Sequence, residues 1–141
     1  MTVSSLLLPV FVQVALTFAL MFWMAGARRA AILGGKVALK DIALREPNWP
    51  ARVTQLANAF HNQLELPVLF YVLIALILIT NSNSTVFVLL AWAFVAARLA
   101  HAYIHTGSNT VPSRFYAMAA SAMILAAMWA IFAVRILISG S

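Results

Sequence analysis

The chain has 141 residues, of which 65% are apolar and 9% are charged, with a mean hydropathy of +0.98. Ordinary soluble domains carry about 25% charged and about 45–50% apolar residues, so this composition excludes a water-soluble globular protein. The absence of cysteine excludes a disulfide framework, a thiolate metal site and a cysteine nucleophile. The net charge of +6 is concentrated in one loop, where basic residues are better explained by the orientation of the protein in a membrane than by nucleic-acid binding.

Four apolar segments are each long enough to cross a membrane, since a transmembrane helix needs about 20 residues. The first ends before Arg28 and Arg29, and it lacks the basic start and the cleavage site of a secretory signal, so we expect it to be retained. The chain is therefore predicted to be one all-α domain, an integral membrane four-helix bundle over residues 1–141, with spans at about residues 6–26, 53–80, 85–105 and 114–138.

The basic residues of the connecting segments predict the orientation of the bundle. Six Lys and Arg side chains lie in the segment 27–52, and Arg114 follows the turn after the third span, whereas the turn at residues 81–84 carries no charge. Under the positive-inside rule the first and third loops face the cytoplasm and both termini lie outside. We expect a multi-pass protein of a bacterial inner membrane, in which Arg135 extends its side chain to the outer interface.

Polar side chains within the spans gather on two helical faces. On the second span, offsets of 3, 4 and 7 place four of them on one face, namely Asn58, His61, Asn62 and Glu65. On the third span, offsets of 3 and 7 do the same for Arg98, His101 and His105. With a rise of about 1.5 Å per residue, Glu65 lies about 15 Å and Arg98 about 10 Å from the cytoplasmic start of its span, so these two charges can meet.

Two interpretations of these faces stay open. In the first, Glu65 and Arg98 form a buried ion pair that only sets the helix register, and breaking such a pair typically costs about 3–5 kcal/mol. In the second, the faces line a polar cavity that opens to the cytoplasm and includes Arg114, because charged groups at membrane depth usually face protein or water.

The remaining polar residues of the spans give two weaker indications, one from the histidines and one from a glutamine. A zinc site is conceivable, but the sequence has neither a HExxH motif nor a thiolate ligand to accompany its three histidines, His61, His101 and His105. Gln13 is the one polar interruption of the first span, and we expect its side chain to bond a neighbouring helix.

The segment from Asn58 to Phe70 (Asn-Ala-Phe-His-Asn-Gln-Leu-Glu-Leu-Pro-Val-Leu-Phe) resembles the second-helix signature of the MAPEG family, the membrane-associated proteins of eicosanoid and glutathione metabolism. The family pattern is approximately Arg-Ala-x-x-Asn-x-x-Glu followed by Pro and Phe, and four positions match it: Asn62, Glu65, Pro67 and Phe70. Further along, the order Arg98, His101, Pro112 and Arg114 resembles the family's third helix and the start of its fourth. The resemblance covers nearly the whole chain.

This resemblance implies a homotrimer that binds glutathione between neighbouring subunits near the cytoplasmic face, with Arg114 as the catalytic residue that holds the glutathione thiolate. The implied binding residues are Arg28, Asn58, Asn62, Glu65, Arg98, His101 and His105. The chain departs from the family pattern at four of its positions: Asn58 and His61 stand in place of arginines, His105 in place of a tyrosine and Phe115 in place of a serine.

Three functions from different classes are compatible with these residues. The first is a membrane-bound, glutathione-dependent transferase or peroxidase-like enzyme acting on lipophilic electrophiles or hydroperoxides, because only the thiolate is a good nucleophile. The second is a non-catalytic trimer that binds lipid or serves as an accessory subunit of a larger membrane complex. A small transporter has the least support, since the sequence shows neither inverted repeats nor a broken mid-membrane helix pair.

The expected partners follow from the same reasoning. We expect contacts with membrane lipids, with a lipophilic small molecule and with further copies of the chain, and none with nucleic acid. A trimer is also predicted on physical grounds, because a lone bundle is expected to leave Arg98 and the polar face of the second span without sufficient partners.

Overall fold

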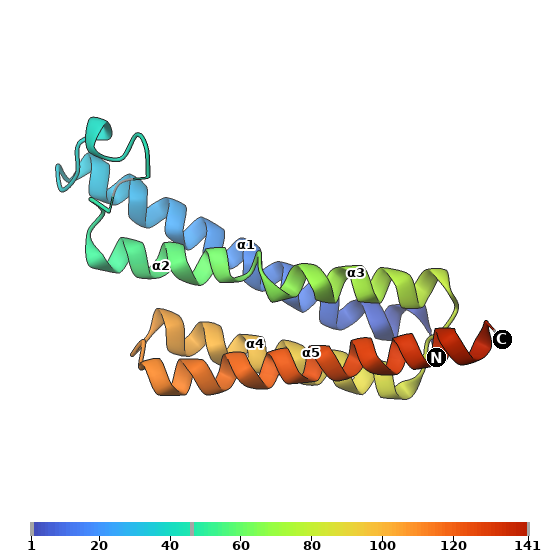
Figure 1. Cartoon of the computed structure of the whole chain (residues 1–141). Coiled ribbons are helices and arrows are strands. Elements are labelled where there is room, and N and C mark those ends of the chain that lie inside the picture. Colours follow the sequence, from blue (N-terminus) through green and yellow to red (C-terminus); the bar gives the residue numbers. More distant parts are fainter. Residues whose placement is uncertain (1, 46, 141) are drawn as a thin grey trace.

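The computed structural model describes residues 2–45 and 47–140, and these form a bundle of long helices without strands (Figure 1). The elements in chain order are α1 (Val3–Leu33), the short 3₁₀ helix η1 (Leu39–Asp41), α2 (Ala51–Asn62), α3 (Leu66–Ile79), α4 (Thr85–Thr106) and α5 (Val111–Ser139). Four helical segments are long and apolar enough to cross a membrane: α1, α2 together with α3, α4 and α5. The predicted all-α, four-helix membrane architecture is confirmed.

The second crossing is interrupted, whereas a continuous helix was predicted over residues 53–80. At the end of α2 the backbone N–H of Gln63 donates to the carbonyl of Phe60 at 2.9 Å, three residues back instead of four. Pro67, in the first turn of α3, has no N–H with which to continue the ladder. The helix therefore breaks over residues 63–65 and starts again at Leu66.

The first helix extends beyond the apolar run that predicted it, and it reaches Leu33. Arg28 and Arg29 therefore lie on helix rather than in a loop. The helix ends where the N–H of Gly34 donates to the carbonyl of Ala30 at 2.9 Å, and Gly35 turns the chain with a φ of +70°. A positive φ is a conformation that glycine adopts without steric cost.

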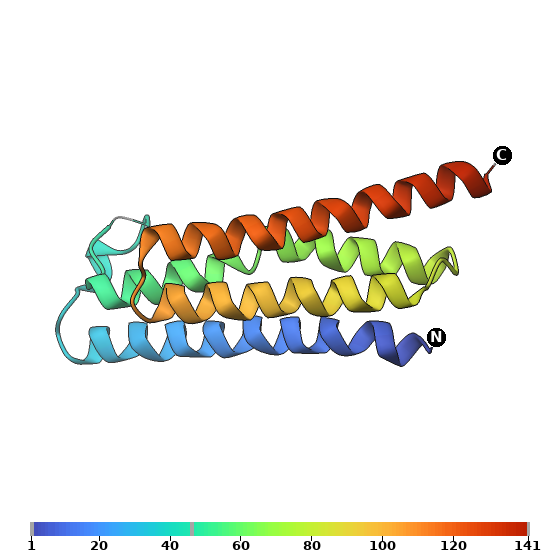
Figure 2. The ribbon, with the colours of Figure 1, turned by 90° about the horizontal axis from the view of Figure 1, so that it is seen from below.

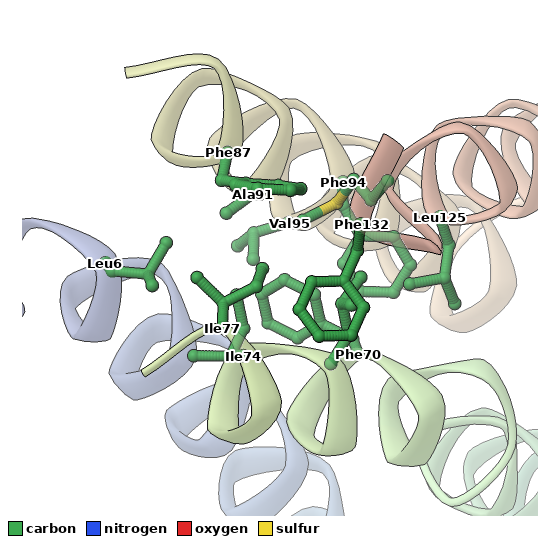
Figure 3. Packing of buried hydrophobic residues seen from close by; sticks show 12 residues of the cluster. Leu6, Phe70, Ile74, Ile77, Phe87, Ala91, Phe94, Val95, Leu125 and Phe132 are labelled. Carbon is green, nitrogen blue, oxygen red and sulfur yellow. The ribbon is translucent and has the colours of Figure 1, made fainter. Parts of the chain in front are cut away.

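The largest apolar core lies in the half of the bundle nearer to the two termini. Figure 3 shows its buried side chains, which come from α1, α3, α4 and α5. Phe70 of α3 and Phe94 of α4 stack at its centre with ring centroids 4.6 Å apart, and both are fully buried. This half of the bundle is thus filled by hydrocarbon, and the polar side chains of the spans lie towards the other end.

Two groups of loops mark the two ends of the bundle. The loop between α1 and α2 and the turn between α4 and α5 lie at one end, and both termini and the α3–α4 turn lie at the other (Figures 1 and 2). Arg135 does not simply extend to an interface: it donates to the carbonyl of Ser82 at 3.3 Å and covers the ring of Phe87 at 5.0 Å. It therefore ties the end of α5 to the α3–α4 turn.

Side chains of α2 hold the carboxyl-terminal end of α4 in place. Gln55 donates from Nε2 to the carbonyls of His105 at 2.8 Å and Gly107 at 3.1 Å, and Arg52 donates to the carbonyl of Thr106. The last carbonyls of a helix have no partner within the helix, and a cation there is favourable. These bonds fix α2 against the α4–α5 turn at the end where the polar side chains gather.

The arrangement of the loops makes the predicted orientation testable with single cysteines, because the chain has none of its own. Lys36 and Ser139 are both exposed and lie in the loop between α1 and α2 and at the end of α5, respectively. With a cytoplasmic basic loop, a membrane-impermeant maleimide added to intact cells labels Ser139→Cys and leaves Lys36→Cys unlabelled. The reverse labelling pattern would invert the orientation.

Candidate functional site

A pocket of about 430 Å³ lies between the end of α2, α4 and the beginning of α5. Its polar lining comprises seven side chains: Asn58, His61, Asn62, Glu65, His101, His105 and Arg114. Val111, Phe115 and Met118 of α5 form its apolar wall. The pocket therefore contains six of the eight side chains that were predicted as site residues, and its size is that of a small-molecule site.

Each wall of the pocket follows from helical spacing. Asn58, His61 and Asn62 lie on adjacent turns of α2, and the imidazoles of His101 and His105 meet edge to face on successive turns of α4, with ring centroids 5.4 Å apart. Both histidines are buried, and the Nδ1 atom of each has no hydrogen-bond partner. Buried polar atoms normally have a partner, so these two atoms are exceptions, and both are themselves buried rather than exposed to the pocket.

Arg114 lies in the first turns of α5 and is half-buried at the rim of the pocket. Its Nη1 atom donates to Oδ1 of Asn109 at 2.6 Å, and Asn109 itself has a φ of +53° in the α4–α5 turn. The guanidinium group carries five N–H donors in a planar fork, so this bond leaves most of them for a ligand.

Arg98 lies beneath the pocket and is fully buried. Its Nη2 atom donates to the backbone carbonyl of Asn62 at 3.1 Å, to the side-chain Oδ1 of the same residue and to Oε1 of Gln63 at 3.4 Å. Its Nη1 atom contacts Sδ of Met118 at 3.1 Å. Arg98 thus binds the end of α2 and holds Asn62, which lines the pocket.

Glu65 does not meet Arg98 as the sequence predicted. The described hydrogen bonds of the guanidinium go to Asn62, Gln63 and Met118, and none goes to the Glu65 carboxylate. Glu65 is the last residue of the break, with φ −98° and ψ −105°, and its side chain lines the pocket with Asn58, His61 and Asn62. Its negative charge acts on Arg98 from the pocket wall rather than through direct contact.

Gln63 was not singled out from the sequence, although it stands between two predicted site residues. Its side chain is 1% exposed, accepts from Arg98 and from Nε2 of Gln13 at 3.0 Å, and donates to the carbonyl of Ala59 at 3.1 Å. The expectation that Gln13 bonds a neighbouring helix is confirmed. A polar residue inside an apolar span, four residues before a proline, is the sequence signal from which this role could have been predicted.

Arg28 lies outside the main pocket. It lines a second pocket of about 390 Å³ below the loop between α1 and α2, and its guanidinium stacks over the ring of Trp49 at 5.1 Å. The two pockets share Asn58 and His61. Arg28 therefore lies in a pocket that adjoins the main one, and the side chains of Asn58 and His61 line both.

The physical argument for a trimer stays a prediction. Arg98 has acceptors for its two Nη atoms within the single chain, but its buried Nε atom has no hydrogen-bond partner and its described hydrogen bonds reach no carboxylate. Asn58, His61 and Glu65, the polar side chains of the second crossing that line the pocket beside Asn62, remain exposed. Within residues 2–45 and 47–140, the histidines and carboxylates form no group of three or more that could hold a metal ion.

Arg98 is expected to be the most important of the arginines for stability. Its replacement by methionine leaves the Asn62 oxygens without their donor, and an unpaired buried acceptor costs about 1–3 kcal/mol of unfolding free energy. Arg29→Met, at an exposed position on α1, is the matched control and should cost less than about 0.5 kcal/mol. Denaturation in detergent followed by tryptophan fluorescence measures both, and equal effects of the two substitutions would contradict the role assigned to Arg98.

Comparison with known proteins identifies the family. A search of curated proteins and a search of solved structures found no match. The family model of the MAPEG family matches residues 6–134, which include every residue of both pockets, the second and third crossings and most of the first and fourth. The chain therefore belongs to the MAPEG family and is an integral, multi-pass membrane protein.

Proposed function

We propose that the protein is a membrane-bound, glutathione-dependent transferase or peroxidase-like enzyme that acts on lipophilic electrophiles or hydroperoxides. The observation that carries this proposal is the composition of the main pocket, in which one arginine, one carboxylate, two asparagines and three histidines face an apolar wall. Membership of a family with glutathione-related functions supports the same ligand.

The polar lining matches the functional groups of glutathione. The ammonium group of the tripeptide can pair with Glu65, and its carboxylates can accept hydrogen bonds from the amides and imidazoles of the lining. Asn58 and Asn62 supply amide donors and acceptors for its peptide groups. The imidazoles of His101 and His105 line the pocket beside these asparagines.

The role proposed for Arg114 is to favour the thiolate of glutathione over the thiol. A guanidinium group beside the sulfur stabilises the negative charge, and the thiolate is the nucleophile that attacks an electrophilic carbon or the O–O bond of a hydroperoxide. Val111, Phe115 and Met118 offer the lipophilic co-substrate an apolar surface next to this arginine. Arg98 has no exposed surface, so its proposed contribution is to hold Asn62 rather than to touch the ligand.

The non-catalytic alternative has one observation in its favour. Arg114 is bonded to Asn109 in the α4–α5 turn, so it also has a structural partner outside the pocket. In that case the protein is a lipid-binding or accessory subunit, and Arg114 serves as an anchor at the membrane surface. An anchor requires charge but no fork geometry, so lysine would replace it without loss.

Substitution of Arg114 distinguishes enzyme from scaffold. If the proposal is right, millimolar glutathione produces a thiolate signal in ultraviolet difference absorbance, and Arg114→Ala abolishes it and lowers the rate with an aryl halide by about a hundredfold. Arg114→Lys should remain impaired, and the melting temperature of both variants should change little because the residue lies at the rim. A wild-type protein without thiolate signal, or an Arg114→Lys variant with full activity, would contradict the enzyme proposal.

We also propose that the functional unit is a homotrimer with its pockets facing the cytoplasm. Exposed polar side chains at membrane depth are costly against lipid, and Asn58, His61 and Glu65 are in this position in a single chain. A neighbouring copy packed against α2 would cover them and complete the site. Native mass spectrometry should therefore release three copies from several detergents, and a uniformly monomeric or dimeric protein would contradict this assembly.

A further inference from the structure

A chain of three buried side chains crosses the bundle beside the break in the second crossing. It runs from Gln13 of α1 through Gln63, at the break, to Arg98 of α4, and these side chains are 0%, 1% and 0% exposed. Gln13 donates to Oε1 of Gln63 at 3.0 Å, and Arg98 donates to the same oxygen at 3.4 Å. One carboxamide oxygen therefore joins three helical segments that are distant in the sequence.

The break in the second crossing explains why these side-chain hydrogen bonds are needed. Since the N–H of Gln63 donates to Phe60, the carbonyl of Ala59 loses the partner that an unbroken helix would provide. The side-chain Nε2 of Gln63 takes over this role at 3.1 Å. The carbonyl of Asn62 accepts from Arg98 at 3.1 Å, in addition to a longer bond of 3.4 Å from the N–H of Glu65. In the absence of water, unpaired backbone groups at this depth would cost several kcal/mol each.

We propose that Gln13 is a positioning residue of the pocket, although it does not line it. Gln13 holds the carboxamide of Gln63 in the one orientation in which Oε1 faces Arg98 and Nε2 faces Ala59. This orientation in turn keeps Arg98 bonded to Asn62, whose side chain forms the floor of the pocket above it. The first helix thereby determines the geometry of a site that is built from α2, α4 and α5.

Two substitutions test this link without introducing charge. Gln13→Met and Gln63→Met keep the length of the side chain and remove its hydrogen bonds, and the double variant removes both partners. Leu8→Met, at a side chain of α1 that is 52% exposed, is the control for an added methionine on this helix. The readout is hydrogen–deuterium exchange of the backbone amides of residues 59–66 in the purified protein, compared with that of α5.

Loss of the link should accelerate exchange at residues 59–66 by about tenfold in Gln13→Met, the size expected for one hydrogen bond, and leave α5 unchanged. Gln63→Met should exchange faster still, because it also loses its bonds to Arg98 and Ala59, and the double variant should resemble Gln63→Met because the bond to Gln13 is then already absent. Leu8→Met should exchange like the wild type. Unchanged exchange in Gln13→Met, or faster exchange along all helices, would overturn the positioning role.

A second measurement connects this role with the ligand, and this part rests on the proposed function. If glutathione binds, titration calorimetry should show an affinity about fivefold to tenfold weaker in Gln13→Met than in Leu8→Met, because the Asn62 amide is no longer held in place. Equal affinities would contradict the link to the pocket. Absence of binding by the wild type would instead contradict the proposed function, and the exchange experiment then decides the positioning role alone.

Discussion

Every backbone N–H and C=O group inside a lipid bilayer needs a partner within the protein, and the break in the second crossing depends on this constraint. An unbroken helix satisfies itself, but Pro67 prevents that here. The freed carbonyls are bonded by side chains from within the bundle, namely Gln63 and the fully buried Arg98. Buried polar side chains are normally unfavourable in an apolar span, but here they bond the backbone carbonyls at the break.

The position of the pocket follows from this division of the bundle. Towards the termini, stacked aromatic and branched side chains fill the space between the helices, as around Phe70 and Phe94 (Figure 3). Beyond the break the apolar clusters are smaller, and polar side chains of α2 and α4 line the pocket. The helices remain joined at that end by Arg52 and Gln55, which bond the last carbonyls of α4. A cavity with polar walls can therefore persist between fixed helices.

The departures from the family pattern give this pocket its own chemistry. Positions where the family carries arginine or tyrosine hold amide and imidazole groups here, at Asn58, His61 and His105. The positive charge within the main pocket is consequently concentrated in Arg114, with that of Arg98 buried beneath the floor. Arg28 and Arg45 lie in the adjoining second pocket. A ligand in the main pocket meets one accessible guanidinium group among neutral donors and acceptors.

Much of this protein could be read from the amino-acid sequence alone. Length and hydropathy determine four membrane crossings, because a helix that spans a bilayer has a known length and must be apolar. Helical periodicity placed Asn58, Asn62, Glu65, His101 and His105 around one cavity, since residues three and four apart share a face. The family was likewise recognisable, because its matching residues are spread over several spans in the right order.

Only the tertiary structure decided which polar groups touch. Periodicity assumes a regular helix, so it paired Glu65 with Arg98, whereas the guanidinium in the folded bundle donates to Asn62 and to Gln63, which lies in the break. The partner of Gln13 is 50 residues distant, and no local pattern can indicate a contact across such a separation. Sequence thus determined which helices form and which faces are polar, because these depend on neighbouring residues. The hydrogen bonds between helices depend on their packing, and so they emerged only from the folded bundle.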